Sequence, residues 1–163
     1  MGTPLTFKAS APYATELIGK LHKPRNSISS GSLKTTLEFV LDLNDDDKRQ
    51  LKAIVTVVVD GMIPDADDKA FTVSVTMECE YNFSAELTEK ELNDQSFVRM
   101  VCEPLYHRGA VIVEQSARTM GFSSIRVATT FPQESLELGV VIPEKLAEPK
   151  PKRAKRKTAQ KTS

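Results

Sequence analysis

The stretch "AFTVSVTMECEYNFS", residues 70–84, places an apolar side chain at every odd position from Phe71 to Phe83 and a polar or small one at every even position. This period of two is typical of a β-strand with one buried face. At about 3.3 Å per residue, that apolar face is roughly 40 Å long, whereas a mean strand has only about 5–6 residues. We therefore expect a large element to cover it.

Two further strands precede this one. "LKTTLEFVLDL", residues 33–43, also alternates, and "QLKAIVTVVVDG", residues 50–61, is apolar on both faces around Val55–Val59, which predicts burial on both sides. The polar loops "NDDDKR" and "MIPDADDK" that join the three strands are too short for helical crossovers. The sequence therefore predicts an antiparallel meander.

Helical signals follow the meander. Thr88 and Glu91 have the spacing of a capping box at the start of a short acidic helix. The longest predicted helix starts at Pro104 and ends at Met120, with Gly121 as its C-terminal stop. About 17 residues make a helix roughly 25 Å long, too short for a 40 Å strand face. We expect the rest of that face to meet a partner subunit or to stay open to ligands.

A fourth strand is needed to complete the sheet, and two segments are candidates. "SSIRVATTF", residues 123–131, returns to alternation, and residues 3–20 are the alternative. The predicted fold class is α+β, with a four-stranded antiparallel sheet and one long helix on one face. We expect an N-terminal segment at 1–32, one domain at 33–148 and a disordered tail at 149–163.

Charge divides the chain into two parts. Residues 149–163 hold seven of the 22 basic side chains and no acidic one, which leaves 22 − 7 = 15 basic against 22 acidic residues, or −7, in residues 1–148. The tail predicts salt-dependent contact with nucleic acid or with an acidic partner. Its candidate residues are Lys150, Lys152, Arg153, Lys155, Arg156 and Lys157.

Motifs of catalysis are not found in the sequence. It has no Gly-x-Ser-x-Gly, HExxH or paired-cysteine pattern, and His22 and His107 are far apart. Cys79 and Cys102, the only cysteines, are expected to be reduced core thiols. We therefore expect a protein that is not an enzyme.

Metal and membrane motifs are missing as well. The acidic loops starting at Asp42 and Asp65 lack the glycine that a calcium loop has at its sixth position. The chain has no run of about 20 apolar residues and no secretory pattern at its N-terminus. The sequence predicts a cytoplasmic protein without cofactors or metals.

The order and spacing of these segments resemble the SecB family of holding chaperones, in particular its divergent members that accompany toxin–antitoxin pairs. The resemblance covers roughly residues 33–131. Its most specific part is the start of the long helix, where Pro104, Tyr106 and Arg108 match a proline, an aromatic residue and an arginine of the family. Gly121 and Phe122 fill the turn at its end.

The resemblance implies a dimer of dimers that binds non-native polypeptides without ATP, in grooves lined by apolar and aromatic side chains. It implies an antitoxin or an export motor as a further partner. The groove candidates are Val75, Met77, Tyr81, Phe83, Phe97, Leu105 and Tyr106. The alternative function is nucleic-acid association through the basic tail.

Overall fold

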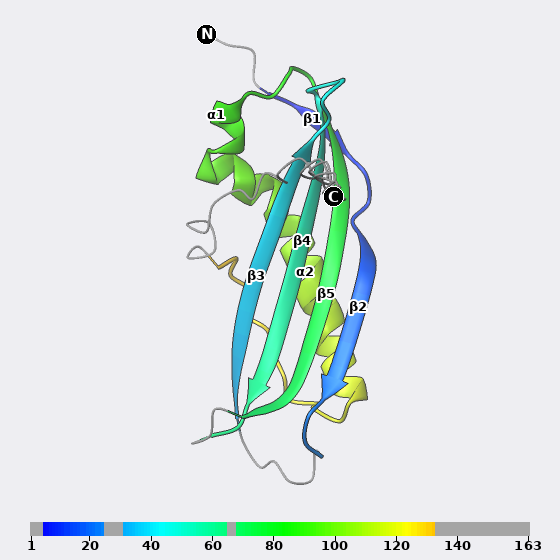
Figure 1. Cartoon of the computed structure of the whole chain (residues 1–163), viewed down its shortest axis with the longest axis vertical. Coiled ribbons are helices and arrows are strands. Elements are labelled where there is room, and N and C mark those ends of the chain that lie inside the picture. Colours follow the sequence, from blue (N-terminus) through cyan, green and yellow to red (C-terminus); the bar gives the residue numbers. More distant parts are fainter. Residues whose placement is uncertain (1–4, 25–30, 65–67, 133–163) are drawn as a thin grey trace, which may run out of the picture.

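The computed structural model describes residues 5–24, 31–64 and 68–132. A long, narrow sheet carries helix α2 along one face (Figure 1). The elements are β1 (Phe7–Ala9), β2 (Tyr13–Leu21), β3 (Ser32–Leu43), β4 (Gln50–Met62), β5 (Lys69–Phe83), α1 (Glu89–Leu92) and α2 (Gln95–Thr119). All strand pairs are antiparallel. The predicted α+β fold, with its meander and one long helix, is confirmed.

The N-terminal segment supplies the remaining edge of the sheet. β1 pairs with the Tyr81–Phe83 part of β5, and β2 pairs with the part between Phe71 and Glu78. The two short strands therefore share one position beside β5, so the five strands make a sheet four positions wide. Residues 123–131 form no strand, and the prediction of one there is wrong.

Helix α2, together with Phe122 just beyond its end, covers the apolar row of β5. Every odd-numbered residue from Phe71 to Phe83 is at most 4% exposed. The helix begins at Gln95, not at Pro104, and the Asp94 carboxylate caps it by accepting a hydrogen bond from the Phe97 amide at 2.9 Å. Its 25 residues extend about 37 Å, close to the length of the row. The expectation of an uncovered part of this face is therefore wrong.

Two of the three predicted helix boundary signals are confirmed: the capping box of Thr88 and Glu91, and the stop at Gly121. The Thr88 amide donates to the Glu91 carboxylate at 2.9 Å ahead of α1. At the end of α2, Gly121 has φ 96°, and the Phe122 amide reaches the Ala117 carbonyl at 2.9 Å. This Schellman arrangement needs a left-handed residue, which glycine adopts without strain. The chain therefore turns at Gly121, and the residues after it run back along α2.

The two faces of β4 differ. Val55, Val57 and Val59 are fully buried under α2, whereas Ile54 and Val58 on the other face are only half-buried. No element of the described chain covers that outer face. The prediction that β4 is buried on both sides is therefore wrong for the described residues. Cys79 and Cys102 are free and buried, as predicted.

Replacing Pro104 with alanine is expected to stabilise the protein by about 1–3 kcal/mol. Pro104 is exposed in the interior of α2, where it cannot donate to the carbonyl of Met100, and a proline there costs about 3 kcal/mol relative to alanine. Urea unfolding measures the change. Gln115→Ala, at an exposed site of the same helix, is the control and is expected to change stability by less than about 0.5 kcal/mol. Equal effects of the two substitutions would show that Pro104 carries no helical cost.

Candidate polypeptide-binding surface

The seven groove candidates named from the sequence are core residues in this structure. They lie between the sheet and α2, and the most exposed of them, Phe97, is only 8% exposed. The Tyr81 hydroxyl donates to the carbonyl of Val101 at 2.8 Å, and the rings of Phe83 and Phe97 are 5.5 Å apart. None of these side chains offers an open surface to a client in this structure. The set is Val75, Met77, Tyr81, Phe83, Phe97, Leu105 and Tyr106.

Burial also changes the acid–base chemistry of this interior. It raises the pKa of Tyr81 and of Tyr106 above the usual value for a phenol, and it raises the pKa of the Cys102 thiol to about 12. These groups therefore stay protonated and neutral at neutral pH. A neutral thiol is a poor nucleophile, so Cys102 acts as a small apolar core residue.

The exposed apolar side chains lie mainly on the edge strand. The large hydrophobic residues that stay exposed among those described are Leu5, Phe7, Tyr13, Leu17, Ile18, Leu21, Met100 and Val111. All but the last two precede residue 22, and every residue of β2 is exposed. Surface patches of this kind are typical of interaction sites.

Strand register assigns three of these residues to the side of the sheet that carries α2. Phe7 is paired with Phe83, Leu17 with Val75 and Leu21 with Phe71, and partners in a ladder point to the same face. We call Phe7, Leu17 and Leu21 the apolar edge. Their exposed fractions are 41%, 52% and 48%. The apolar edge thus continues the buried row of β5 outward to the surface.

Aromatic contacts join one end of the apolar edge to the core. The ring centroid of Phe7 lies 5.4 Å from that of Tyr81 and 5.5 Å from that of Phe83. Aromatic pairs at this spacing contribute about 0.5–1.5 kcal/mol beyond burial of area. Phe7 is therefore held in place while part of its ring remains available for contact.

The outer face of the sheet is polar by comparison. The Lys52 ammonium lies 2.6 Å from the Glu78 carboxylate, which also accepts a hydrogen bond from the Tyr13 hydroxyl at 3.1 Å. Lys52 lowers the pKa of Glu78, and Glu78 raises the pKa of Tyr13. An open hollow of about 670 Å³ near β1 is lined by Lys8, Asp42 and Glu80, among others. Such a surface suits polar partners better than apolar ones.

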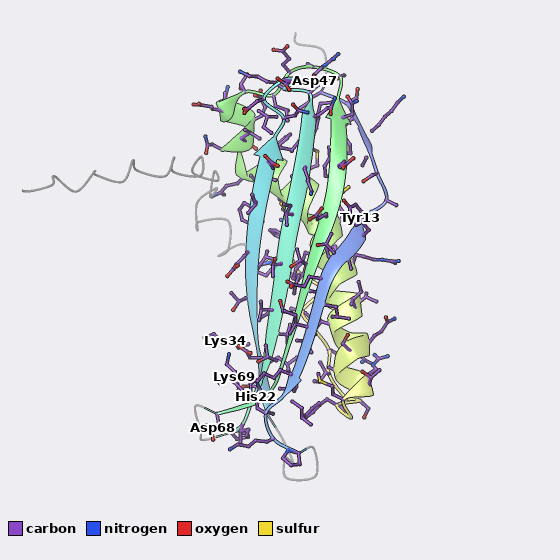
Figure 2. All side chains as sticks on the ribbon, turned by 45° about the vertical axis from the view of Figure 1, so that its right-hand side comes forward. Tyr13, His22, Lys34, Asp47, Asp68 and Lys69 are labelled. Atoms are coloured by element: carbon purple, nitrogen blue, oxygen red, sulfur yellow. The ribbon has the colours of Figure 1, made fainter. Side chains whose placement is uncertain are left out.

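A buried carboxylate anchors the opposite end of the sheet, where Figure 2 shows His22, Lys34, Asp68 and Lys69 gathered. Asp60 is 6% exposed, pairs with Lys69 at 2.8 Å and accepts a hydrogen bond from Thr72 at 2.6 Å. Burial by itself raises its pKa, but the bonds from Lys69 and Thr72 outweigh that effect, and the net shift is downward. His22 contacts the same Thr72 hydroxyl at 3.0 Å. In a nucleophile–base pair, the hydroxyl donates its hydrogen bond to the histidine. The Thr72 hydroxyl donates to Asp60 instead, so Thr72 and His22 do not form such a pair.

Metal ligands do not cluster in the described parts of the chain. Those residues hold no group of three or more histidine, cysteine or acidic side chains suited to a metal ion. No helix among them is both long and apolar enough to cross a membrane. The tail candidates Lys150, Lys152, Arg153, Lys155, Arg156 and Lys157 lie outside the described residues.

The apolar edge was missed by sequence reasoning because its periodicity is broken. A bulge between Ala14 and Glu16 shifts the register, so the alternation that starts at Leu17 does not continue the pattern of the residues before the bulge. Leu17 and Ile18 are both apolar but point to opposite faces, which further obscures the pattern in the sequence. The signal that was available is the recurrence of Leu17, Gly19 and Leu21, which all lie on the α2 side. Three alternating positions are too few to identify a strand.

Comparison with known proteins gives a result at the level of fold. No family model and no curated protein sequence matches the chain. Among solved structures, the Mycobacterium tuberculosis Rv1957 SecB-like chaperone, in complex with a ChAD peptide from the Rv1956 HigA1 antitoxin, is similar with a TM-score of 0.61. The two are 10% identical, and the match covers 77% of this chain and 88% of that one.

A protein of unknown function from Streptococcus agalactiae also matches, at 10% identity and a TM-score of 0.49, over 79% of this chain and 100% of the other. At such identities, likeness is a matter of fold. The sheet order, the long helix α2 on one face and the Rv1957 match agree with one another. The chain therefore has a SecB-like fold.

Proposed function

We propose that the protein is an ATP-independent chaperone that holds non-native polypeptides, and that it is not an enzyme. The observation that carries this proposal is the apolar edge, where large apolar side chains stay exposed beside a core of the same character. The SecB-like fold supports it, since the similar Rv1957 structure is a chaperone in complex with an antitoxin peptide. An antitoxin or an export motor is the proposed further partner, and the cytoplasm the proposed location.

Apolar contact suits the holding of many different chains. Its free energy follows the area removed from water, at about 25 cal/mol per Å², and does not depend on a particular pattern of hydrogen bonds. A client side chain the size of leucine therefore contributes about 1.5–3 kcal/mol wherever it is buried. Several weak contacts of this kind give useful affinity with little sequence selectivity.

The same exposed strand supports a proposed assembly into a dimer of dimers. In the described chain, the outer side of β2 pairs with no other strand, so its amides and carbonyls are free to pair with a second chain. Met100 and Val111 add apolar surface on the solvent side of α2. We propose that a second copy covers the β2 end of the apolar edge, at Leu17 and Leu21, and that another pair packs against α2. Phe7, at the other end of the apolar edge, then stays open to clients.

Leu17→Asp is expected to reduce the oligomer to smaller species while the fold is retained. Leu17 is 52% exposed on the α2 side of the edge, so a carboxylate there costs little in the monomer but is buried when a second copy docks. Light scattering coupled to size-exclusion chromatography measures the mass. Ile18→Asp, at a neighbouring residue 50% exposed on the opposite face, is the matched control and should change the mass less. Wild-type mass for Leu17→Asp would contradict the edge interface.

A second candidate function is nucleic-acid association through the basic tail. The observation that favours it is the concentration of seven basic and no acidic residues in 149–163. Binding of this kind neutralises phosphates and weakens steeply as salt rises. The tail has no aromatic residue for base stacking, so it would not read sequence.

Aggregation of a reduced model protein, followed by light scattering with full-length chain and with residues 149–163 removed, separates the two functions. A chaperone is expected to suppress aggregation equally well in both forms. A nucleic-acid module would lose binding to a random DNA duplex on truncation and would leave aggregation unchanged. Failure of both forms to suppress aggregation at a tenfold excess would overturn the chaperone proposal.

A further inference from the structure

An irregular extended segment follows α2 and runs back along it. We call residues 123–132 the strap. It leaves the turn at Gly121, and Figure 1 shows it in yellow to orange on the side of the sheet that carries α2. Val127 is bonded to Glu114 and Ala128 to Tyr106, so the strap and the helix run in opposite directions.

The strap buries two of its own side chains but forms no helix or strand. Val127 is 4% exposed and Phe131 is fully buried, while Thr129 and Thr130 face solvent. The ring of Phe131 meets that of Tyr106 edge to face, with 5.6 Å between centroids. Apolar side chains four residues apart therefore pack beside α2, and we call the surface that they cover the channel.

Side chains of α2 hold the backbone of the strap. The Tyr106 hydroxyl donates to the carbonyl of Ala128 at 2.6 Å, and the Glu114 carboxylate accepts from the amide of Val127 at 2.9 Å. Residues 123–132 make no backbone–backbone hydrogen bond to the rest of the described chain. Peptide groups are common to all polypeptides, so this donor and acceptor pair does not depend on the sequence it binds.

The strap thus resembles a bound extended peptide, because side chains of α2 hold its backbone and no strand of the described chain pairs with it. Its Ile, Val and Thr residues favour extended structure, yet it is paired with no strand. Tyr106 is the main contact of α2 with the strap, since its hydroxyl and its ring both meet strap residues. The channel therefore offers an aromatic ring, a hydroxyl donor and a carboxylate acceptor to an extended segment with apolar residues at i and i+4.

We propose that residues 125–131 occupy the client channel of this protein as an internal competitor, and that a client binds by displacing them. This inference rests on the proposed holding function and adds to the apolar edge a second client-binding surface, together with its regulation. It also places Tyr106, one of the residues named from the sequence, in the wall of the site once the strap leaves. Affinity for a client is then set by the fraction of molecules in which the strap is open.

Hydrogen exchange on the full-length chain tests the displacement. The probe is a reduced and carboxymethylated model protein that stays unfolded, added in excess. The Val127 amide is expected to be protected in the free protein and to lose at least about tenfold in protection with the probe, whereas the amides of β4 and β5 keep theirs. Binding with unchanged protection at Val127 would overturn the competitor and leave the holding function standing. No binding at all would overturn both.

Substitution in the strap gives an independent test. Phe131→Ala is expected to tighten probe binding by about tenfold or more because it weakens the closed state. Thr130→Ala, exposed in the same segment, is the matched control and should leave affinity unchanged. Val127→Thr, which keeps the shape but adds a hydroxyl, should act in the same direction if Phe131→Ala proves unstable. Equal or weaker binding by a folded variant would contradict the proposal.

Discussion

Gly109→Leu is expected to lower the free energy of unfolding by about 3 kcal/mol, because α2 lies too close to the sheet for a side chain of that size. A Cβ at position 109 would lie 3.1 Å from Val57, 3.2 Å from Val75 and 3.4 Å from Met77. Leucine adds three more carbons to a space that a single carbon fills, and overpacking costs about 1–3 kcal/mol or more. Since leucine has a better helix propensity than glycine, the loss isolates the packing effect.

Urea unfolding followed by circular dichroism measures this change. Val111→Leu, two residues further along and 50% exposed, is the matched control and should stay within about 0.5 kcal/mol of wild type. If Gly109→Leu proved as stable as the control, α2 would not pack on β4 and β5 as the structure has it. The SecB-like arrangement of helix and sheet would then need revision.

Met77→Ala is expected to cost about 2–5 kcal/mol of stability and to leave the affinity of the folded protein for clients unchanged. Met77 is 1% exposed under α2, so its loss leaves a cavity. Met100→Ala removes the same side chain from a site that is 40% exposed, and a change below about 0.5 kcal/mol is expected. Unfolding midpoints and probe binding are measured on the same samples.

The opposite pattern would locate the client differently. If Met77→Ala kept wild-type stability but lost probe binding, β5 would be open to clients in solution and α2 would move away to admit them. The residues named from the sequence would then be contact residues after all. The comparison of the two methionines thus distinguishes a core residue from a groove residue by direct measurement.

The strands of the meander were predictable because their periodicity is strong and their loops are short. Val73 and Val75 repeat at two, which predicts the face that they share, and both lie on the buried face in the structure. The caps at Thr88 and Gly121 were predictable for a similar reason, since each depends on local backbone chemistry. Local signals of this kind need no knowledge of the tertiary fold.

The start of α2 was not predictable from the same rules. Proline is favoured in a first helical turn, and Pro104 suggested a start there. In the structure, the stripe of Val98, Val101 and Leu105 continues across Pro104, and its burial against the sheet outweighs the lost hydrogen bond. The extra turns make the helix long enough to cover β5. The apolar side chains of β5 that the sequence suggested for clients are therefore buried in this structure.

Buried and exposed apolar residues have the same sequence signature, which is why the exposed apolar surface was harder to predict than the fold. Phe83 and Phe7 are both aromatic residues in strands, yet the first is 2% exposed and the second 41%. Only their positions in the sheet, central against edge, separate them. The strap is a similar case, because its alternation is that of a strand although no strand pairs with it.

Calorimetric titration of the carboxymethylated model protein into the full-length chain, repeated at several temperatures and at 0.5 M salt, tests the holding function most directly. Binding through apolar surface is expected to persist at high salt and to show a negative heat-capacity change. Removal of residues 149–163 should leave both unchanged. Absence of binding, or binding that is lost at 0.5 M salt and on removal of the tail, would contradict a holding chaperone and leave the basic tail as the active part of the molecule.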